Sequence, residues 1–189
     1  TVIIDGKKVG KPSKRLTFHQ KDLKITNAKI VKLQKDKSFI DVPVKRTNIQ
    51  KKLDEVRLHS DQIIYPGKYT ITIDFTGSIT KPMDGIYPCF FKHNGQDKRL
   101  IATQFESHHA RQAFPCIDEP SAKATFNLTL KTREQLVTVS NTPITKQTSN
   151  NNGQVTVFDT TPVMSTYLLA FVIGDMGYKE AKTKRGVTV

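Results

Sequence analysis

The chain has 189 residues, and its 30 lysines and arginines against 17 aspartates and glutamates give a net charge of +13 at pH 7. A chain of this length suits one domain that buries roughly two thirds of its unfolded surface. No stretch approaches the ~20 apolar residues of a membrane helix, and two cysteines, Cys89 and Cys116, are too few for a disulfide framework or a cysteine zinc site. We interpret both as buried free thiols, with one disulfide between them as the alternative.

Alternation of apolar with polar residues is the dominant pattern, and a period of two predicts strands with one face on the core. The pattern is clearest where Tyr69, Ile71, Ile73 and Phe75 alternate with polar residues. In chain order, we expect strands at 2–4, 15–19, 23–26, 30–33, 40–44, 55–58, 69–75, 100–103, 126–130, 136–140, 155–158 and 167–172.

Turn residues separate these strands. They occur at 5–6, 65–67, 76–78, 84–85, 94–95 and 150–153. Asn94 with Gly95, and the polar run at 150–153, are flanked by residues typical of hairpins, and one short turn of helix fits His108 to Ala113. We therefore expect an all-β fold, an antiparallel β-sandwich or saddle, with no linker or repeat that divides the chain.

Both ends of the chain are strand-like. Thr1 is followed at once by Val2, Ile3 and Ile4, and the chain closes on a second strand-like stretch at 186–189. We therefore expect residues 1–189 to be a single β domain, truncated at both ends, of a longer polypeptide.

The segment 103–120 differs from the rest of the chain. Its sequence, TQFESHHARQAFPCIDEP, is dense in polar and ionisable groups, and Pro115 and Pro120 restrict its backbone. Irregular, charged excursions on a β scaffold are where binding residues concentrate. We therefore take this segment as the candidate binding region.

The same segment resembles the N-terminal domain of the M1-family zinc aminopeptidases. The matching pieces are TQFE at 103–106, AR at 110–111 and AFPCIDEP at 113–120. Further matches are KATF at 123–126, SNTP at 140–143 and TPVMSTYLLAF at 161–171, and before the segment 69–79 and 84–87. The resemblance begins near Thr17, keeps the expected order, and implies the saddle-like antiparallel β fold of that domain.

The family's zinc-binding motif is absent from these residues. M1 enzymes bind zinc through His-Glu-x-x-His on a helix and a later Glu, and a Gly-x-Met-Glu-Asn segment helps to bind the substrate amine. Neither motif occurs here, and none of the five histidines pairs as His-x-x-x-His. We therefore expect no catalytic residue, cofactor or metal ligand in this chain, which would be inactive alone. The resemblance implies zinc in a catalytic domain of the same polypeptide, which becomes the partner of this domain.

Gln104 and Glu106 are the candidate substrate-binding residues, because they match the Gln and Glu that line the family's pocket for the first residue of a peptide. A free α-amine has a pKa near about 8 and is largely cationic at pH 7, so a carboxylate gives it a charge-assisted hydrogen bond. The alternatives are that Glu106 pairs with Arg111 or a nearby lysine, and that Gln104 makes a structural hydrogen bond. Ser107 stands where many family members have proline, which leaves the shape of the pocket open.

The other ionisable residues of the segment receive structural interpretations. His108 and His109 are adjacent, and adjacent side chains are expected to point in different directions, which argues against shared metal ligation. Arg111, Asp118 and Glu119 are expected to fix the segment through ion pairs and turn hydrogen bonds.

The sequence is compatible with three functions. The leading one is the N-terminal, substrate-amine-anchoring domain of a zinc-dependent aminopeptidase that removes N-terminal residues from peptides. The second is a non-catalytic, M1-like interaction module. The third is a basic β domain that binds nucleic acid or acidic polymers, but the basic residues are spread along the chain and no RNA-binding signature or zinc finger accompanies them. A solvated lysine-rich surface, or a face complementary to an acidic partner domain, also accounts for the charge.

Overall fold

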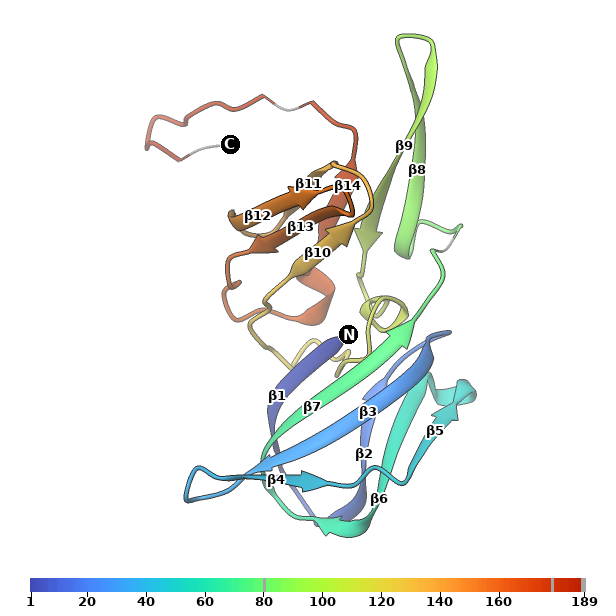
Figure 1. Ribbon diagram of the computed structural model, residues 1–189, viewed down its shortest axis with the longest axis vertical. Coiled ribbons are helices and arrows are strands. Elements are labelled where there is room, and N and C mark those ends of the chain that lie inside the picture. Colours follow the sequence, from blue (N-terminus) through green and yellow to red (C-terminus); the bar gives the residue numbers. More distant parts are fainter. Residues whose placement is uncertain (80, 178, 188–189) are drawn as a thin grey trace.

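Antiparallel strands form four small sheets in the computed structural model, which describes residues 1–79, 81–177 and 179–187. Two sheets lie in the first half of the chain and two in the second, and the halves follow one another along the long axis of the molecule (Figure 1). The expectation of an all-β antiparallel fold is confirmed. Within the described residues, no helix is both long and apolar enough to cross a membrane.

The first half is a sandwich of two sheets. One has the strand order β1-β7-β3-β4, with the bounds Val2–Lys8, Gly67–Thr76, Lys24–Leu33 and Phe39–Val42. The other has the order β2-β6-β5, with the bounds Ser13–His19, Glu55–Ile64 and Arg46–Gln50. A short 3₁₀ turn, η1, links β5 to β6 at Lys51–Leu53.

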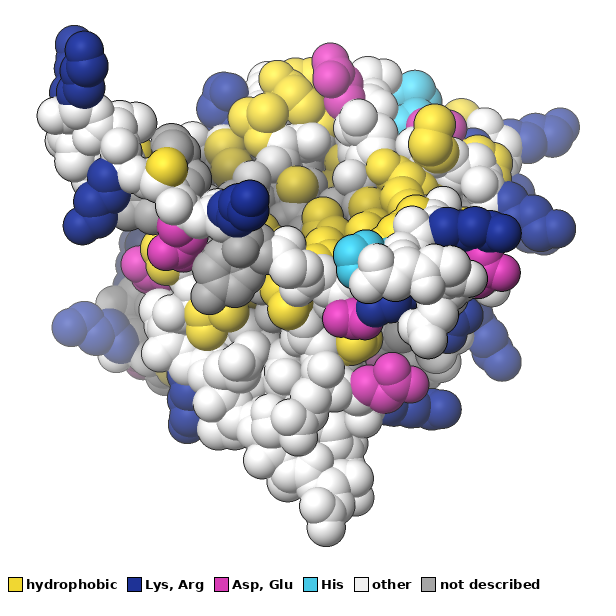
Figure 2. Space-filling view, turned by 90° about the horizontal axis from the view of Figure 1, so that it is seen from above, with side chains coloured by type: hydrophobic (Ala, Val, Ile, Leu, Met, Phe, Trp, Pro, Cys, Tyr) yellow, Lys and Arg dark blue, Asp and Glu magenta, His cyan; other side chains and the backbone are white. Residues whose placement is uncertain are grey.

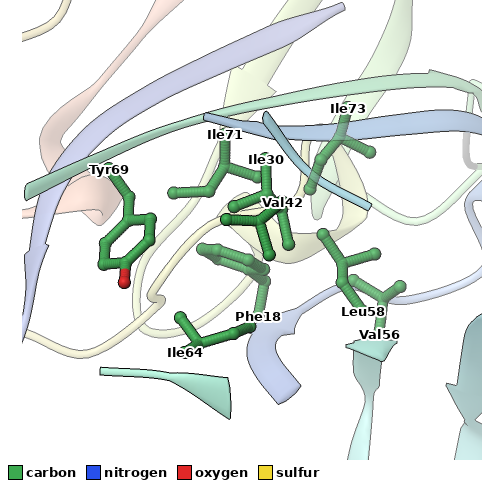
Figure 3. Close-up of a cluster of buried hydrophobic side chains, with 9 residues drawn as sticks. All are labelled: Phe18, Ile30, Val42, Val56, Leu58, Ile64, Tyr69, Ile71 and Ile73. Carbon is green, nitrogen blue, oxygen red and sulfur yellow. The ribbon is translucent and has the colours of Figure 1, made fainter. Parts of the chain in front are cut away.

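The core of the first half lies between its two sheets. Because side chains alternate across a strand, Tyr69, Ile71 and Ile73 of β7 point to one side and lie in the same cluster as Val56 and Leu58 of β6 (Figure 3). Burial of each such side chain stabilises the fold by about 1.5–3 kcal/mol. The buried cluster consists of Phe18, Ile30, Val42, Val56, Leu58, Ile64, Tyr69, Ile71 and Ile73.

The second half also contains two sheets. The larger has the order β11-β14-β9-β8, with the bounds Val137–Ser140, Phe171–Gly174, Gln96–Gln104 and Gly85–His93. The smaller has the order β10-β13-β12, with the bounds Thr129–Thr132, Gly153–Phe158 and Ile144–Asn150. Two 3₁₀ turns, η2 and η3, lie in the connections at Ala110–Gln112 and Thr166–Leu168.

The β8–β9 hairpin projects from the second half (Figure 1). Its turn residues Asn94 and Gly95 both have positive φ, 50° and 77°, which is the geometry of the type I′ turn that Asn-Gly favours. The hairpins expected around these two residues and around 150–153 are both confirmed.

The turn expected at Asp5 and Gly6 is wrong, because these residues continue β1 and pair with β7. An Asp-Gly pair favours a turn locally, but here its backbone groups are paired with a neighbouring strand. The two strands expected at 23–26 and 30–33 are one strand, β3, with a register shift in its first half. β5 was not predicted, since its sequence RTNIQ has a single large apolar residue.

Two strands expected in the second half are shorter than predicted. The strand expected to begin at 126 starts only at Thr129, because the preceding backbone makes isolated hydrogen bonds, with Thr161 N donating to Phe126 O and Phe158 N donating to Leu128 O, rather than a continuous ladder. The apolar run expected as a buried strand at 167–172 contains part of η3 and an exposed Leu168, and only its end joins β14. A short apolar run does not by itself distinguish a strand from a turn of helix.

The strand expected at 186–189 is not formed by those of its residues that are described. Gly186 follows a turn, in which its N donates to Thr183 O at 2.9 Å, and Val187 is irregular. Thr188 and Val189 lie outside the described residues.

Both cysteines carry free thiols, so the disulfide alternative is wrong. Cys116 is buried, and this burial, together with the nearby charge of Asp118, raises the pKa of its thiol. Cys116 is therefore a protonated, apolar side chain at neutral pH. The expectation of burial is wrong for Cys89, which is partly exposed in β8 because this strand belongs to the hairpin that projects from the second half.

Candidate functional site

The segment 105–120 leaves the end of β9 and crosses the boundary between the two halves (Figure 1). Backbone hydrogen bonds attach it to the first half: His19 N donates to Cys116 O at 2.8 Å, and Cys116 N donates to His19 O at 3.1 Å. Lys21 N also donates to Arg111 O at 2.8 Å. The excursion that the sequence indicated is therefore a bridge between the halves.

Apolar side chains on the inner side of this segment form a small second core. Phe105 is 1% exposed, and its ring meets that of Phe114 edge-on with 5.9 Å between the centroids. Because successive side chains of an extended chain point to opposite sides, the burial of Phe105 directs Gln104 and Glu106 outward, and both are exposed. The other buried members of the cluster are Ala110, Cys116 and Leu169.

A buried ion pair holds the middle of the segment. Arg111 Nε donates to Asp118 Oδ2 at 3.0 Å, and the Asp118 side chain is only 1% exposed. Thr166 Oγ1 donates to the other carboxylate oxygen at 2.8 Å, and the Asp118 backbone N donates to His19 Nδ1 at 3.0 Å. Because both carboxylate oxygens accept hydrogen bonds, the cost of burying the charge is offset. The predicted structural roles of Arg111 and Asp118 are confirmed, and Glu119 lies 3.8 Å from His19 Nε2.

The Glu106 carboxylate has no hydrogen bond or ion pair with any side chain in the part of the chain that the structure describes. Arg111, its alternative partner, is occupied by Asp118. Gln104 Oε1 accepts a hydrogen bond from the Glu106 backbone N at 3.1 Å, so the structural hydrogen bond considered for Gln104 is present. The Glu106 charge is therefore uncompensated and open to a cation from solvent.

His108 and His109 follow this carboxylate, and their rings stack with 4.9 Å between centroids and 20° between planes. The expectation that they point in different directions is wrong, because they lie in a turn rather than in a regular helix or strand. Ser107 Oγ lies 2.7 Å from His108 Nδ1, and Gln112 Nε2 lies 3.0 Å from His109 Nδ1. Asp84 Oδ1 is 3.7 Å from His109 Nε2. Across the described ranges, no three His, Cys, Asp or Glu side chains form a group that could hold a metal ion.

Gln104 also borders an apolar sheet face that sequence reasoning missed. The register places Val139, Val172, Ala102 and Tyr87 side by side across β11-β14-β9-β8, and Gln104 is on the same side of β9 as Ala102. Val139 is 52% exposed, whereas the preceding residue of β11 is buried. Figure 2 shows a band of hydrophobic side chains at this end of the molecule, with lysines and arginines around its margin. β8 and β9 carry continuous apolar runs rather than alternation, so only the register shows which of their residues share this face and that four strands contribute.

Known proteins share much of this sequence. Residues 1–168 match the family model described as the peptidase M1 N-terminal domain. The chain is 51% identical over 125 residues to Aminopeptidase N of Lactococcus lactis subsp. cremoris (strain MG1363), a match covering 65% of this chain and 14% of that protein. It is 39% identical over 132 residues to Aminopeptidase M1 of Arabidopsis thaliana, covering 70% of this chain and 15% of that protein. It is 39% identical over 144 residues to Puromycin-sensitive aminopeptidase of Caenorhabditis elegans, covering 75% and 15%. The chain thus spans about a seventh of the length of these curated relatives.

Proposed function

The chain belongs to the peptidase M1 N-terminal domain family, and from this premise we propose that it is the substrate-amine-anchoring domain of a larger zinc-dependent aminopeptidase. The relatives that it matches are named aminopeptidases, and it spans a small part of their length. Hydrolysis is therefore proposed for the longer polypeptide, and anchoring of the peptide's N-terminus for Glu106. On this proposal the chain alone is inactive.

The exposed, unpaired carboxylate of Glu106 carries the proposal. A peptide's α-ammonium group would donate a charge-assisted hydrogen bond to it, and such a bond is stronger in a cleft that excludes water. An amine held at a fixed distance from the site of hydrolysis limits cleavage to the first peptide bond. Gln104, whose Oε1 accepts from the Glu106 backbone, keeps its amide N–H groups as donors beside the first side chain.

The chain on both sides of Glu106 is held in place. Phe105 is packed in the small core directly before it, and the buried Arg111–Asp118 pair fixes the chain after it. A rigid support lowers the conformational entropy that binding would otherwise cost. Arg111 and Asp118 are thus positioning residues, because their polar groups are used within the segment.

The apolar sheet face supports the proposed partner, a catalytic domain of the same polypeptide. An exposed apolar face of this kind marks an interaction surface. Gln104 lies at its border, so a domain packed there would lie next to Gln104 and Glu106. The described residues form no metal-binding group and do not fit the zinc that the family implies. The proposed catalytic domain would hold the zinc, which supplies an activated water when bound.

Substitution of Glu106 by Gln in the longer polypeptide tests the proposal. Loss of one charge-assisted contact costs about 1.5–3 kcal/mol, so kcat/KM for a peptide with a free N-terminus should fall by about 10- to 150-fold. Glu134→Gln, which removes an exposed carboxylate from the loop between β10 and β11, should leave kcat/KM unchanged. A wild-type kcat/KM in Glu106→Gln would remove this residue from its role.

The polypeptide beyond Val189 distinguishes the enzyme from a non-catalytic interaction module. A His-Glu-x-x-His motif there supports the aminopeptidase, because that spacing places two imidazoles on one helix face around a zinc ion. Absence of the motif would contradict the catalytic assignment and favour the interaction module.

A further inference from the structure

A row of three basic side chains crosses the outer face of the sheet β2-β6-β5. The register pairs Arg15 of β2 and Arg46 of β5 with the same residue, His59 of β6. Directly opposite residues of antiparallel strands share a face, with Cβ atoms about 4.5–5.5 Å apart. The neighbours of His59 along β6, Leu58 and Ser60, are buried, so the Arg15–His59–Arg46 row faces outward.

The positive charges of this row are not compensated. In the adjacent row, Arg57 Nε donates to Glu55 Oε2 at 2.8 Å, and Arg57 Nη2 lies 2.8 Å from the same oxygen. Within the described part of the chain, by contrast, neither Arg15 nor Arg46 has a carboxylate partner. The two arginines stand on either side of His59, so their charges are left for an anion from solvent.

His59 adds an unsatisfied polar atom at the centre of the row. Its Nε2 is buried and has no hydrogen-bond partner, which is uncommon for a buried polar atom. Burial first, and then the charges of the neighbouring arginines, lower the pKa of His59, so the ring is neutral at pH 7. In the tautomer with the proton on Nε2, the ring can donate to an acceptor bound between the arginines. The charged side chains around it on this face are Arg15, Arg46, Arg57, Glu55, Asp61 and Lys45.

We propose that the Arg15–His59–Arg46 row binds carboxylates of an acidic protein segment. Each guanidinium takes one carboxylate, because its planar fork matches a carboxylate with two parallel hydrogen bonds, and His59 Nε2–H donates to one of them. The net charge of +13 attracts an acidic segment before contact. The row lies in the first half and does not include Glu106, so this inference is independent of the proposed amine anchoring.

The surroundings of the row favour protein carboxylates over nucleic acid. Single-stranded nucleic acids stack their bases on aromatic side chains, and the outward positions of β2, β6 and β5 around the row carry no Phe, Tyr or Trp. Glu55 and Asp61 lie on either side of His59 on the same face. Both are already paired, Glu55 with Arg57 and Asp61 with Lys45. The uncompensated charges among these side chains are therefore the two separate ones of Arg15 and Arg46, which suit two carboxylates better than a continuous phosphate backbone.

Binding of a labelled oligoglutamate peptide at low salt, followed by fluorescence anisotropy, tests the proposal. The double variant R15Q/R46Q should bind about tenfold or more weakly, because it loses both charge-assisted contacts. The matched variant K35Q/K68Q removes the same charge from exposed residues elsewhere and should bind within about twofold of the wild type. Equal weakening in both variants would overturn the proposal, since only a general attraction would remain. All four residues are exposed, and thermal melts verify that both variants fold.

A labelled single-stranded DNA of equal charge distinguishes phosphates from carboxylates. Weaker binding of the DNA than of the peptide supports an acidic protein segment. Tighter binding of the DNA, lost in R15Q/R46Q, would overturn it in favour of a phosphate polymer.

The imidazole of His59 gives a second, site-specific measurement by nitrogen NMR. A bound carboxylate stabilises the protonated ring, so the peptide should shift the Nε2 resonance and raise the pKa of His59. By linkage, the peptide should bind more tightly as pH falls through that pKa. An unchanged His59 resonance at saturating peptide would contradict a contact at the row.

Discussion

The two halves of the molecule bury their apolar residues in different ways. The first half encloses a cluster of nine buried residues between two sheets (Figure 3). Among the described residues, the cluster in the second half has four buried members, and one face of its larger sheet leaves Val139 and Phe91 exposed. The first half therefore has the larger enclosed core, whereas one sheet face of the second half presents a surface that another domain can cover.

This contrast separates the residues that stabilise the fold from those that are available for binding. The segment 105–120 lies where the halves meet, with Phe105 and Asp118 buried and Gln104 and Glu106 exposed. A rigid scaffold that carries binding groups on an irregular segment is a common arrangement. The halves therefore have different expected responses to substitution.

The largest effect is expected where the halves are joined. Asp118→Asn leaves the Arg111 guanidinium largely buried without its counter-charge, and removal of one partner of a buried pair costs about 3–5 kcal/mol. Urea unfolding of the 189-residue chain measures the loss. Glu119→Gln, at an exposed neighbour, should change the free energy of unfolding by less than about 0.5 kcal/mol. A similar, small change in both variants would show that the ion pair does not stabilise the segment that joins the halves.

The next test compares one residue from each half. Leu58 is fully buried in the first core, so Leu58→Ala should lower the free energy of unfolding by about 2–5 kcal/mol. Val139 lies on the apolar sheet face and is 52% exposed, so Val139→Ala should cost less than about 1 kcal/mol. If urea unfolding gives equal losses, the sheet face is buried in solution and the contrast between the halves is wrong.

The smallest effect is a pH dependence that belongs to the first half. Because the folded state lowers the pKa of His59, the unfolded chain binds more protons between the folded and unfolded pKa values. The stability from this group is complete above the unfolded pKa of about 6.5 and is lost as pH falls toward the folded pKa. The free energy of unfolding should therefore drop less in His59→Gln than in the wild type between about pH 7 and pH 5. Parallel pH profiles would contradict a perturbed His59.

Much of the first half could be predicted from local patterns, and the errors arise where pairing with another strand overrides the local pattern. The alternation of Tyr69, Ile71 and Ile73 identified the buried face of β7 correctly. The turn predicted at Asp5 and Gly6 is wrong, because the local preference of these residues for a turn is weaker than the hydrogen bonds that pair them with β7. β5 was not predicted, because its residues are mostly polar and they form a strand only through hydrogen bonds with β6.

The candidate site was predictable only in part. Gln104 and Glu106 followed from the resemblance, and the single buried residue between them accounts for the exposure of both. The stacking of His108 on His109 could not be predicted, because the turn that carries them depends on contacts with distant residues. The apolar sheet face required the register of four strands.

Local sequence is sufficient for the alternating strands, the turn at Asn94 and Gly95, and the motif that contains Glu106, because each depends on residues that are close together in the chain. The pairing of strands is different, since ladder hydrogen bonds accept almost any alternating sequence and the packing of distant side chains selects the partner and the register. The hydrogen bond from Asp118 N to His19 Nδ1 joins residues 99 positions apart. The Arg15–His59–Arg46 row likewise exists only because three separate strands meet in one register.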